Sequence, residues 1–239
     1  LGYTGEELEL MLNPPEEPTE PAASDDEAPA VDEAAPPDSQ PGQVYELGPH
    51  RLVCGDSRDA AVIAALMGTD IAECNVSDPP YGISYKSPSG RGQTARGNYD
   101  IIKGDTEKFD PKHLLDSAKT VVLWGANHYA DSLPASACWM VWDKREGDAI
   151  NNNSDCELAW CNTGGSARLF HHKWNGMIKA SERDQKRVHP TQKPVALIAW
   201  VFDTVNAGNI VADYYAGSGT TLIAAAQTGR VARVIELDP

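Results

Sequence analysis

Short apolar runs alternate with segments of helical periodicity over residues 44–239. The runs are rich in Val, Ile, Leu and Trp and are bounded by turn residues, so they predict strands. The predicted strands lie at 44–47, 51–54, 71–77, 120–124, 138–142, 156–161, 210–213 and 232–237, and the predicted helices lie at 59–67, 194–205 and 219–228. This alternation predicts an α/β fold with a doubly wound, mostly parallel sheet.

The first 43 residues do not show this pattern. Capping-box spacing ahead of several leucines predicts a short helix at about 4–12. Residues 13–43 consist mainly of Pro, Glu, Asp and Ala, with almost no large apolar side chains, so they cannot bury enough surface to offset the entropy of ordering. We therefore expect a short helix and a disordered acidic linker at 1–43, followed by one folded domain at 44–239.

Residues 86–103 form a second segment without apolar periodicity. They combine glycines with basic residues and few large apolar side chains. Such a segment has too few apolar side chains to be ordered by packing, and long loops after a strand often carry function. We expect a functional loop here.

Charge and cysteine content narrow the functional classes. The formal charge of -15 comes mostly from residues 1–43, which hold 12 of the 35 acidic residues and no Lys or Arg. The remaining chain is nearly neutral and can present a basic cleft to a polyanion. The five cysteines show no Cys-x-x-Cys spacing, and His171-His172 has no metal-ligand spacing, so we expect no disulfide framework and no metal site. No apolar run approaches the roughly 20 residues of a membrane span, which predicts a cytoplasmic protein without a membrane partner.

A glycine turn follows the predicted strand at 210–213 and leads into a predicted helix. Residues 213–221 read Asp-Tyr-Tyr-Ala-Gly-Ser-Gly-Thr-Thr, and a doubly wound sheet forms its ligand site at such a strand end. Gly217 and Gly219 let the backbone approach a ligand closely, whereas Asp213 would repel a pyrophosphate and attract an ammonium group. Glu236 ends the next strand, where a carboxylate can accept hydrogen bonds from both ribose hydroxyls. The pattern indicates a nucleoside cofactor with a cationic end, and several such cofactors fit it.

A second motif, Asp78-Pro79-Pro80-Tyr81, directly follows the buried strand predicted at 71–77. The prolines hold the backbone extended and leave carbonyl oxygens free to accept hydrogen bonds. An exocyclic amine of a nucleobase is a poor nucleophile because its lone pair is delocalised into the ring. Two acceptors on its N–H groups push the nitrogen towards tetrahedral geometry, and the Asp78 carboxylate and the Pro79 carbonyl can supply them. Tyr81 offers an aromatic face to a base that has left its stack.

These two motifs and the segment His189-Pro190-Thr191-Gln192-Lys193-Pro194 resemble the permuted amino-directed DNA methyltransferases, often called the beta class. The resemblance covers residues 44–239, and it depends on the tetrapeptide preceding the cofactor motif. It implies a Rossmann-like, circularly permuted S-adenosylmethionine-dependent methyltransferase fold with a seven-stranded sheet. It also implies direct in-line transfer of a methyl group to a flipped base of double-stranded DNA. Adenine N6 is the expected target because Asp opens the tetrapeptide.

The resemblance also implies roles for individual residues. Residues Asp78, Pro79, Pro80 and Tyr81 are expected to be catalytic. The methionine end of S-adenosylmethionine is expected against Asp213, Gly217 and Gly219, its carboxylate at Thr191 and Lys193, its ribose at Glu236 and its adenine near Asp56, with Tyr215 and Thr220 completing the site. The strand at 51–54 is expected to neighbour the last strand of the chain.

Residues 162–188 are expected to form a short target-recognition segment. They combine basic and aromatic residues suited to phosphates and unstacked bases, and their small number predicts a short or relaxed recognition sequence. Residues 121–129, 138–144 and 156–160 look like those of phage and bacterial adenine methyltransferases, which include restriction-modification enzymes. Phage proteins of this kind often carry a ParB-like domain, and a former fusion to one would explain the acidic linker.

Two features depart from the family pattern. Tyr214 stands where the family usually has Pro, and the chain ends at Pro239, ahead of the helix that normally follows the last strand. Three alternatives remain open at this point: a cytosine-N4 enzyme, an enzyme that methylates RNA or a protein amide, and an inactive DNA-binding module. A cytosine-C5 enzyme is excluded because no cysteine follows a proline. A homodimer is also left open.

Overall fold

The computed structural model describes residues 39–83, 105–147, 154–175, 178–181 and 192–238, all within one unit that spans residues 37–239. Several predictions lie outside the described residues: the helix at 4–12, most of the acidic linker, the loop at 86–103 and Thr191. The last residues of the expected linker are described, and they join the domain, since the Gly42 amide donates a hydrogen bond to the Cys54 carbonyl at 2.7 Å.

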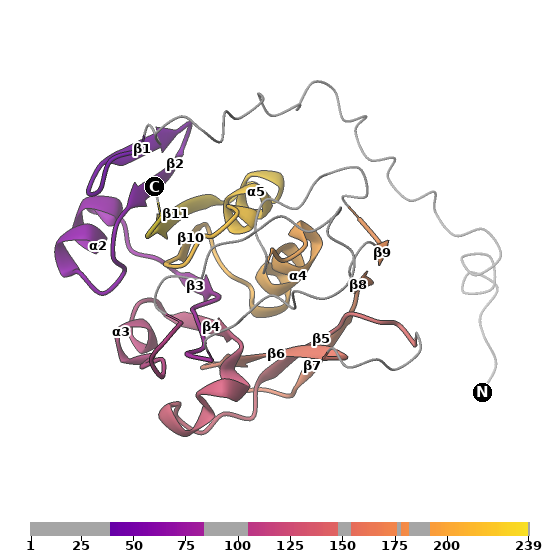
Figure 1. The fold of residues 1–239 in the computed structure, drawn as a ribbon. Helices are drawn as coiled ribbons and strands as arrows, with labels where there is room; N and C mark the ends of the chain where they lie inside the picture. The colour runs from indigo at the N-terminus through magenta and orange to yellow at the C-terminus, as the bar shows by residue number, and fades with distance from the viewer. Residues whose placement is uncertain (1–38, 84–104, 148–153, 176–177, 182–191, 239) are drawn as a thin grey trace, which may run out of the picture. The chain divides into compact units, whose positions relative to one another are not determined.

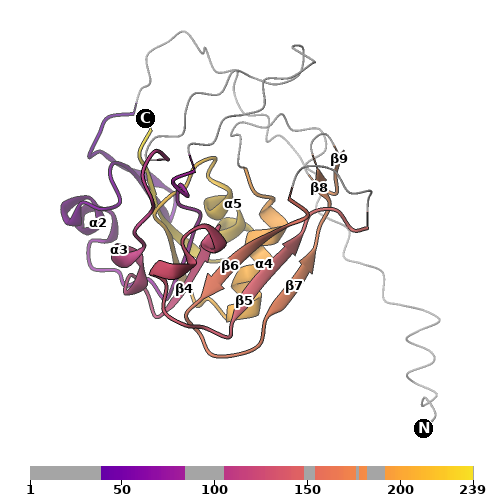
Figure 2. The same cartoon turned by 60° about the horizontal axis from the view of Figure 1, so that its bottom comes forward.

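A nine-stranded mixed sheet forms the centre of this unit (Figures 1 and 2). In spatial order its strands are β1 (Val44–Leu47), β2 (His50–Cys54), β11 (Val231–Glu236), β10 (Ile210–Asp213), β3 (Cys74–Ser77), β4 (Thr120–Trp124), β6 (Cys156–Cys161), β5 (Trp139–Asp143) and β7 (Arg168–His171). The five strands from β2 to β4 run parallel to one another, and β1 is antiparallel to β2. Strand β6 is antiparallel to both β4 and β5, so β5 and β7 again point the same way as β4. Two short strands, β8 (Trp174–Asn175) and β9 (Ile178–Lys179), pair separately.

Helices cover both faces of the sheet. They are α2 (Ala60–Met67), α3 (Lys112–Leu115), α4 (Val195–Val205) and α5 (Thr220–Gln227), with 3₁₀ turns η1 (Ala126–His128) and η2 (Ala130–Ser132) after β4. Adjacent residues of β10 enter opposite cores: Val211 packs with α4 and α5, and Ala212 packs with α2 and α3. This alternation follows from the two-residue period of a strand. The predicted doubly wound α/β fold is confirmed, but the sheet has nine strands and not the seven that the resemblance implies, because β1 and β7 extend its two edges.

The order of the strands also confirms the predicted neighbour of the last strand. Residues Arg51 to Cys54 of β2 pair in parallel with Arg233 to Glu236 of β11. The C-terminal strands β10 and β11 therefore lie between β2 and β3, which come from the first part of the domain. This arrangement places the glycine turn after β10 beside the tetrapeptide after β3.

The structure differs from the sequence prediction at three elements. The strand predicted at 71–77 begins only at Cys74, and Ile71 is 81% exposed. Strand β7 lies within the expected recognition segment and extends the sheet at one edge, as β1 does at the other. Its side chains are mostly exposed, so the sequence has no alternating apolar pattern that would predict it, and pairing with β5 positions it. The short helix α3 was also missed. No helix among the described residues is both long and apolar enough to cross a membrane.

Candidate active site

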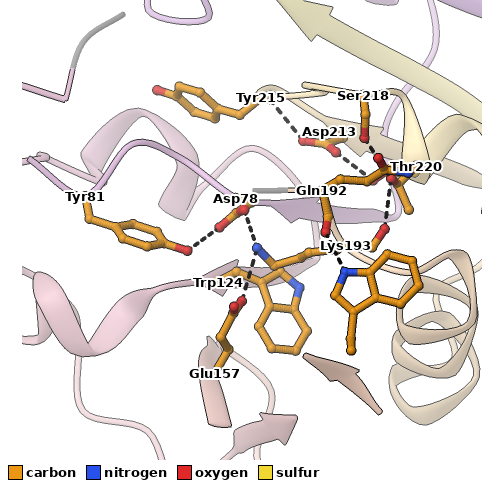
Figure 3. Close-up of polar contacts among 12 residues, drawn as sticks. Asp78, Tyr81, Trp124, Glu157, Gln192, Lys193, Asp213, Tyr215, Ser218 and Thr220 are labelled. Carbon is orange, nitrogen blue, oxygen red and sulfur yellow. Dashed lines mark hydrogen bonds and ion pairs between the residues drawn. The ribbon is translucent and has the colours of Figure 1, made fainter. Parts of the chain in front are cut away.

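The two sequence motifs meet at one edge of the sheet. Strands β3 and β10 are adjacent and parallel, so Asp78, which directly follows β3, and Asp213, which ends β10, lie at the same strand ends. A pocket opens between them. Its lining includes Asp78, Lys193, Asp213, Tyr215, Gly217 and Thr220 from the predicted site. Figure 3 shows the side chains of Asp78, Lys193, Asp213, Tyr215 and Thr220. Ligands bind at this edge in doubly wound sheets.

The carboxylate of Asp78 is held on both oxygens. The Tyr81 hydroxyl donates a hydrogen bond to Oδ1 at 2.7 Å, and the Lys193 ammonium forms an ion pair with Oδ2. Burial, and then the charge of Asp78, raise the pKa of Tyr81 well above its ordinary value, so the phenol remains a donor. Since each carboxylate oxygen can accept two hydrogen bonds, Asp78 keeps acceptor capacity for a further N–H group.

The position of the Tyr81 ring depends on a glycine and a histidine that follow β4. The ring stacks on His128, with centroids 4.9 Å apart and an interplanar angle of 11°. Gly125 adopts a left-handed φ of 67°, and a Cβ atom there would overlap the Tyr81 ring. Only glycine allows both the turn and the close approach. Neither residue was predicted as part of the site, although both lie in the stretch 121–129, which resembles adenine methyltransferases.

Lys193 lies buried between two carboxylates. Besides Asp78 it faces Glu157 of β6, with Nζ 3.4 Å from Oε2, and Nζ is 5.6 Å from the centre of the Trp124 ring (Figure 3). Burial alone would lower the pKa of Lys193, but the charges of Asp78 and Glu157 outweigh it, and the pKa is raised. The other Glu157 oxygen, Oε1, pairs with Lys144 at 2.9 Å. Glu157 and Lys144 were not predicted as site residues, because a charged residue at a strand end has no distinctive local signal.

Asp213 is buried without a cationic partner among the described residues. The Thr221 hydroxyl donates to Oδ2 at 2.6 Å and the Tyr215 amide donates to Oδ1 at 3.0 Å. Burial raises the pKa of Asp213 to about 6, and the charge of Asp78 acts in the same direction. A buried carboxylate that meets only neutral donors fits an ammonium group of a ligand.

The glycine turn is tied to the end of β11. The Gly217 amide donates to Glu236 Oε2 at 2.6 Å, while Oε1 accepts from the amides of Leu237 and Asp238. Gly219 has a φ of 76° at the start of α5, and a Cβ atom there would meet nothing within 4 Å. The Thr220 hydroxyl donates to the Lys193 carbonyl at 3.1 Å, which joins α5 to the segment that carries the lysine.

Some predicted residues lie beside the pocket rather than in its lining. Asp56 forms a bidentate pair with Arg58, at 2.7 Å from Nη2 and 3.0 Å from Nε. Tyr215 lines the pocket, while its ring packs against Phe109 and its hydroxyl lies 2.9 Å from His113 Nε2. The predicted residues outside the lining are Pro79, Pro80, Tyr81, Asp56, Gly219 and Glu236, and Thr191 is outside the described residues. Within the described part of the chain, no group of His, Cys, Asp and Glu residues is arranged to hold a metal ion.

Comparison with protein families identifies the chain. The family model described as DNA methylase, of the N6/N4 methyltransferase type, matches residues 115–239. The chain belongs to this family. It is therefore an S-adenosylmethionine-dependent DNA methyltransferase that acts on an exocyclic amino group of a base. The matched residues include Lys193, the glycine turn and Glu236, whereas the tetrapeptide at 78–81 precedes them.

Several solved structures are similar to this chain. M1.HpyAVI in complex with SAM is 17% identical, with a TM-score of 0.41, over 79% of this chain and 94% of that chain. The PvuII cytosine-N4-specific DNA methyltransferase is 13% identical, with a TM-score of 0.48, over 84% and 86%. TTHA0409 from Thermus thermophilus, complexed with S-adenosyl-L-methionine, is 18% identical, with a TM-score of 0.40, over 80% and 88%. No curated protein sequence matches the chain significantly.

Proposed function

We propose that this methyltransferase modifies N6 of adenine in double-stranded DNA, with Asp78 and the Pro79 carbonyl as acceptors for the target amine. The observation that carries the proposal is the meeting of Asp78 and Asp213 in one pocket. One of these carboxylates precedes a Pro-Pro-Tyr segment suited to an amine acceptor, and the other suits a cationic cofactor. The adenine assignment depends on Asp as the first residue of the tetrapeptide.

The residues of the pocket fit S-adenosylmethionine. When bound, the cofactor supplies an electrophilic methyl group on a sulfonium sulfur. Asp213 would hold its ammonium group, because this buried carboxylate otherwise meets only neutral donors among the described residues. Lys193 and Thr191 would hold the methionine carboxylate, and Glu236, with the open turn at Gly219, would hold the ribose. Lys193 already contacts Asp78, so this lysine would link the cofactor site to the target base.

The side chains of the tetrapeptide orient the target amine. Tyr81 and Lys193 fix the orientation of the Asp78 carboxylate. The directions of its remaining lone pairs are therefore set by the protein and not by solvent. Acceptors fixed in this way need little reorganisation during the reaction. The Asp78 carboxylate and the Pro79 carbonyl would accept the N–H groups of the target amine and direct its lone pair towards the methyl group that the cofactor supplies, and the amine would then lose one proton to solvent. Tyr81, stacked on His128, would hold the flipped base beside Asp78.

Basic residues at the same edge would contact the DNA. Strands β5 and β7 point the same way as β4, so the residues that follow them lie at the edge that holds the pocket. Lys144 follows β5 and Lys173 follows β7, and both side chains are partly exposed, whereas Arg145 is buried and pairs with Asp155. Cations in such positions suit the phosphates on either side of a flipped nucleotide. We therefore propose that residues 162–188 recognise the target, within a methyltransferase domain at 44–239.

Analysis of methylated nucleosides tests this function. DNA methylated by the purified protein is digested and separated by mass spectrometry, and N6-methyladenine is expected. N4-methylcytosine would overturn the adenine assignment, and methylation of RNA or protein in place of DNA would overturn the substrate. Asp78→Asn should reduce transfer by at least about 100-fold, because it removes a charged acceptor. Asp131→Asn, a change of the same charge at an exposed residue, is the matched control.

A further inference from the structure

Glu157 is a charged residue inside the site to which neither motif assigns a role. It lies near the first residue of β6, at the strand end that faces the pocket, and its side chain is 29% exposed. Its two oxygens bind different cations: Oε2 faces Lys193 at 3.4 Å and Oε1 binds Lys144 at 2.9 Å. Burial alone would raise the pKa of Glu157, but these two lysines outweigh it, so the pKa is lowered and the side chain is a carboxylate. Lys193 is thus shared between Glu157 and Asp78.

The sharing of Lys193 matters because Asp78 has a limited number of acceptor positions. A carboxylate offers about four, and Tyr81 and Lys193 already use one on each oxygen. The target amine needs a free position directed towards the pocket. Glu157 places a second carboxylate within ion-pair distance of Lys193, so the charge of the lysine is not balanced by Asp78 alone.

The charges of the three groups lead to the same conclusion. During transfer, positive charge leaves the sulfonium and appears on the acceptor nitrogen beside Asp78. An ammonium group paired with Asp78 alone would cancel the negative charge that stabilises this nitrogen. Glu157 supplies the second negative charge of the cluster, so that two carboxylates balance Lys193 and Lys144, whereas without it Asp78 alone would face both lysines. Fixed charges act strongly in a site that excludes water.

We propose that Glu157 is a positioning residue that fixes Lys193 from the side opposite Asp78 and offsets the charge of the lysine, so that the Asp78 carboxylate keeps its negative charge for the target amine. This inference deepens the proposed function and rests on it. It assigns Glu157 to the Asp78 side of the pocket, where it acts through Lys193.

Glu157→Gln is the decisive variant, because it removes the charge and keeps the shape. The single-turnover rate of tritium transfer to DNA is expected to fall about 10- to 100-fold. Glu157→Asp keeps the charge but shortens the side chain by one methylene group, so it should give an intermediate rate. Asp155→Asn, an exposed carboxylate two residues earlier that pairs with Arg145, is the control and should transfer at the wild-type rate.

A second measurement uses the protein without cofactor or DNA. The titration of Lys193 is followed by carbon-13 NMR of its Cε atom, assigned with a Lys193→Arg sample. Because Glu157 raises the pKa of Lys193, Glu157→Gln should move this titration to lower pH, and Asp155→Asn should not. This measurement does not require activity, so it separates the inference from the proposed function.

The outcomes are distinct. A wild-type protein that does not methylate DNA defeats the proposed function. The wild-type protein could instead methylate DNA while a folded Glu157→Gln variant keeps the wild-type rate and an unchanged Lys193 titration. That result would overturn only the role of Glu157. Equal losses in Glu157→Gln and Asp155→Asn would also overturn it. If Glu157→Gln does not fold, the same two measurements are made on Glu157→Asp. A wild-type rate of transfer and an unchanged Lys193 titration in Glu157→Asp would then overturn the inference.

Discussion

Burial of Asp213 should make the protein less stable as the pH rises. The native pKa of Asp213 is raised from 3.8 to about 6 by burial, against the hydrogen bonds from Thr221 and Tyr215. Between these two values the native protein holds a proton that the unfolded chain has released. The free energy of unfolding therefore falls as the pH rises from about 4 to about 6. Replacement of the carboxylate by a neutral amide, in Asp213→Asn, should remove this dependence.

The size of the effect follows from the shift. A difference of about two pKa units corresponds to about 3 kcal/mol at neutral pH. Asp213 is only 5% exposed, so solvent screens this energy little. The Asp213→Asn variant should be as stable as the wild type at about pH 4 and more stable by up to about 3 kcal/mol at about pH 7. The same variant should bind S-adenosylmethionine at least about 100-fold more weakly, because it lacks the charge that pairs with the ammonium group.

Urea denaturation of both proteins at several pH values measures the difference directly. Calorimetry with S-adenosylhomocysteine then gives the loss of affinity in the same samples. A difference in unfolding free energy that does not change with pH would show that Asp213 does not titrate in this window. A variant that binds the cofactor normally would refute the assignment of Asp213 to the ammonium group, whatever its stability.

Three further predictions concern residues around the site. Gly125→Ala would drive a Cβ atom into the Tyr81 ring and force a left-handed φ, so it should lower the melting temperature and the rate of methyl transfer together, and an unchanged rate would contradict the geometry. Thr221→Val removes the hydroxyl that donates to Asp213 and so raises the pKa of Asp213 further. The fall in unfolding free energy with pH should therefore extend to higher pH, and the unfolding free energy should drop by about 1–2 kcal/mol in the same denaturation series. Ile71→Ser changes a side chain that is 81% exposed, and a change in unfolding free energy above about 0.5 kcal/mol would show that Ile71 is buried in solution.

The comparison of sequence and structure shows which features are encoded locally. The strands at 44–47, 120–124, 156–161 and 210–213 have the predicted bounds, because each is an apolar run of strand length between turn residues. Both motifs lie at strand ends, as the sequence predicted, since a glycine turn or a Pro-Pro segment ends a strand through its own backbone preferences. Strand β7 lacked such a signal, because an exposed edge strand forms through pairing with its neighbour.

The sequence by itself therefore determined the fold class and the places of the two motifs, and the chemistry of Asp78 and Asp213 stays a prediction. Only the tertiary structure decided which side chains surround these carboxylates. Glu157 faces Lys193 because β6 enters the sheet antiparallel beside β4, which brings the start of β6 to the strand ends that hold the pocket. Tyr81 contacts Gly125 because β3 and β4 pair in register. Such contacts depend on strand order and register, which no local pattern of residues specifies.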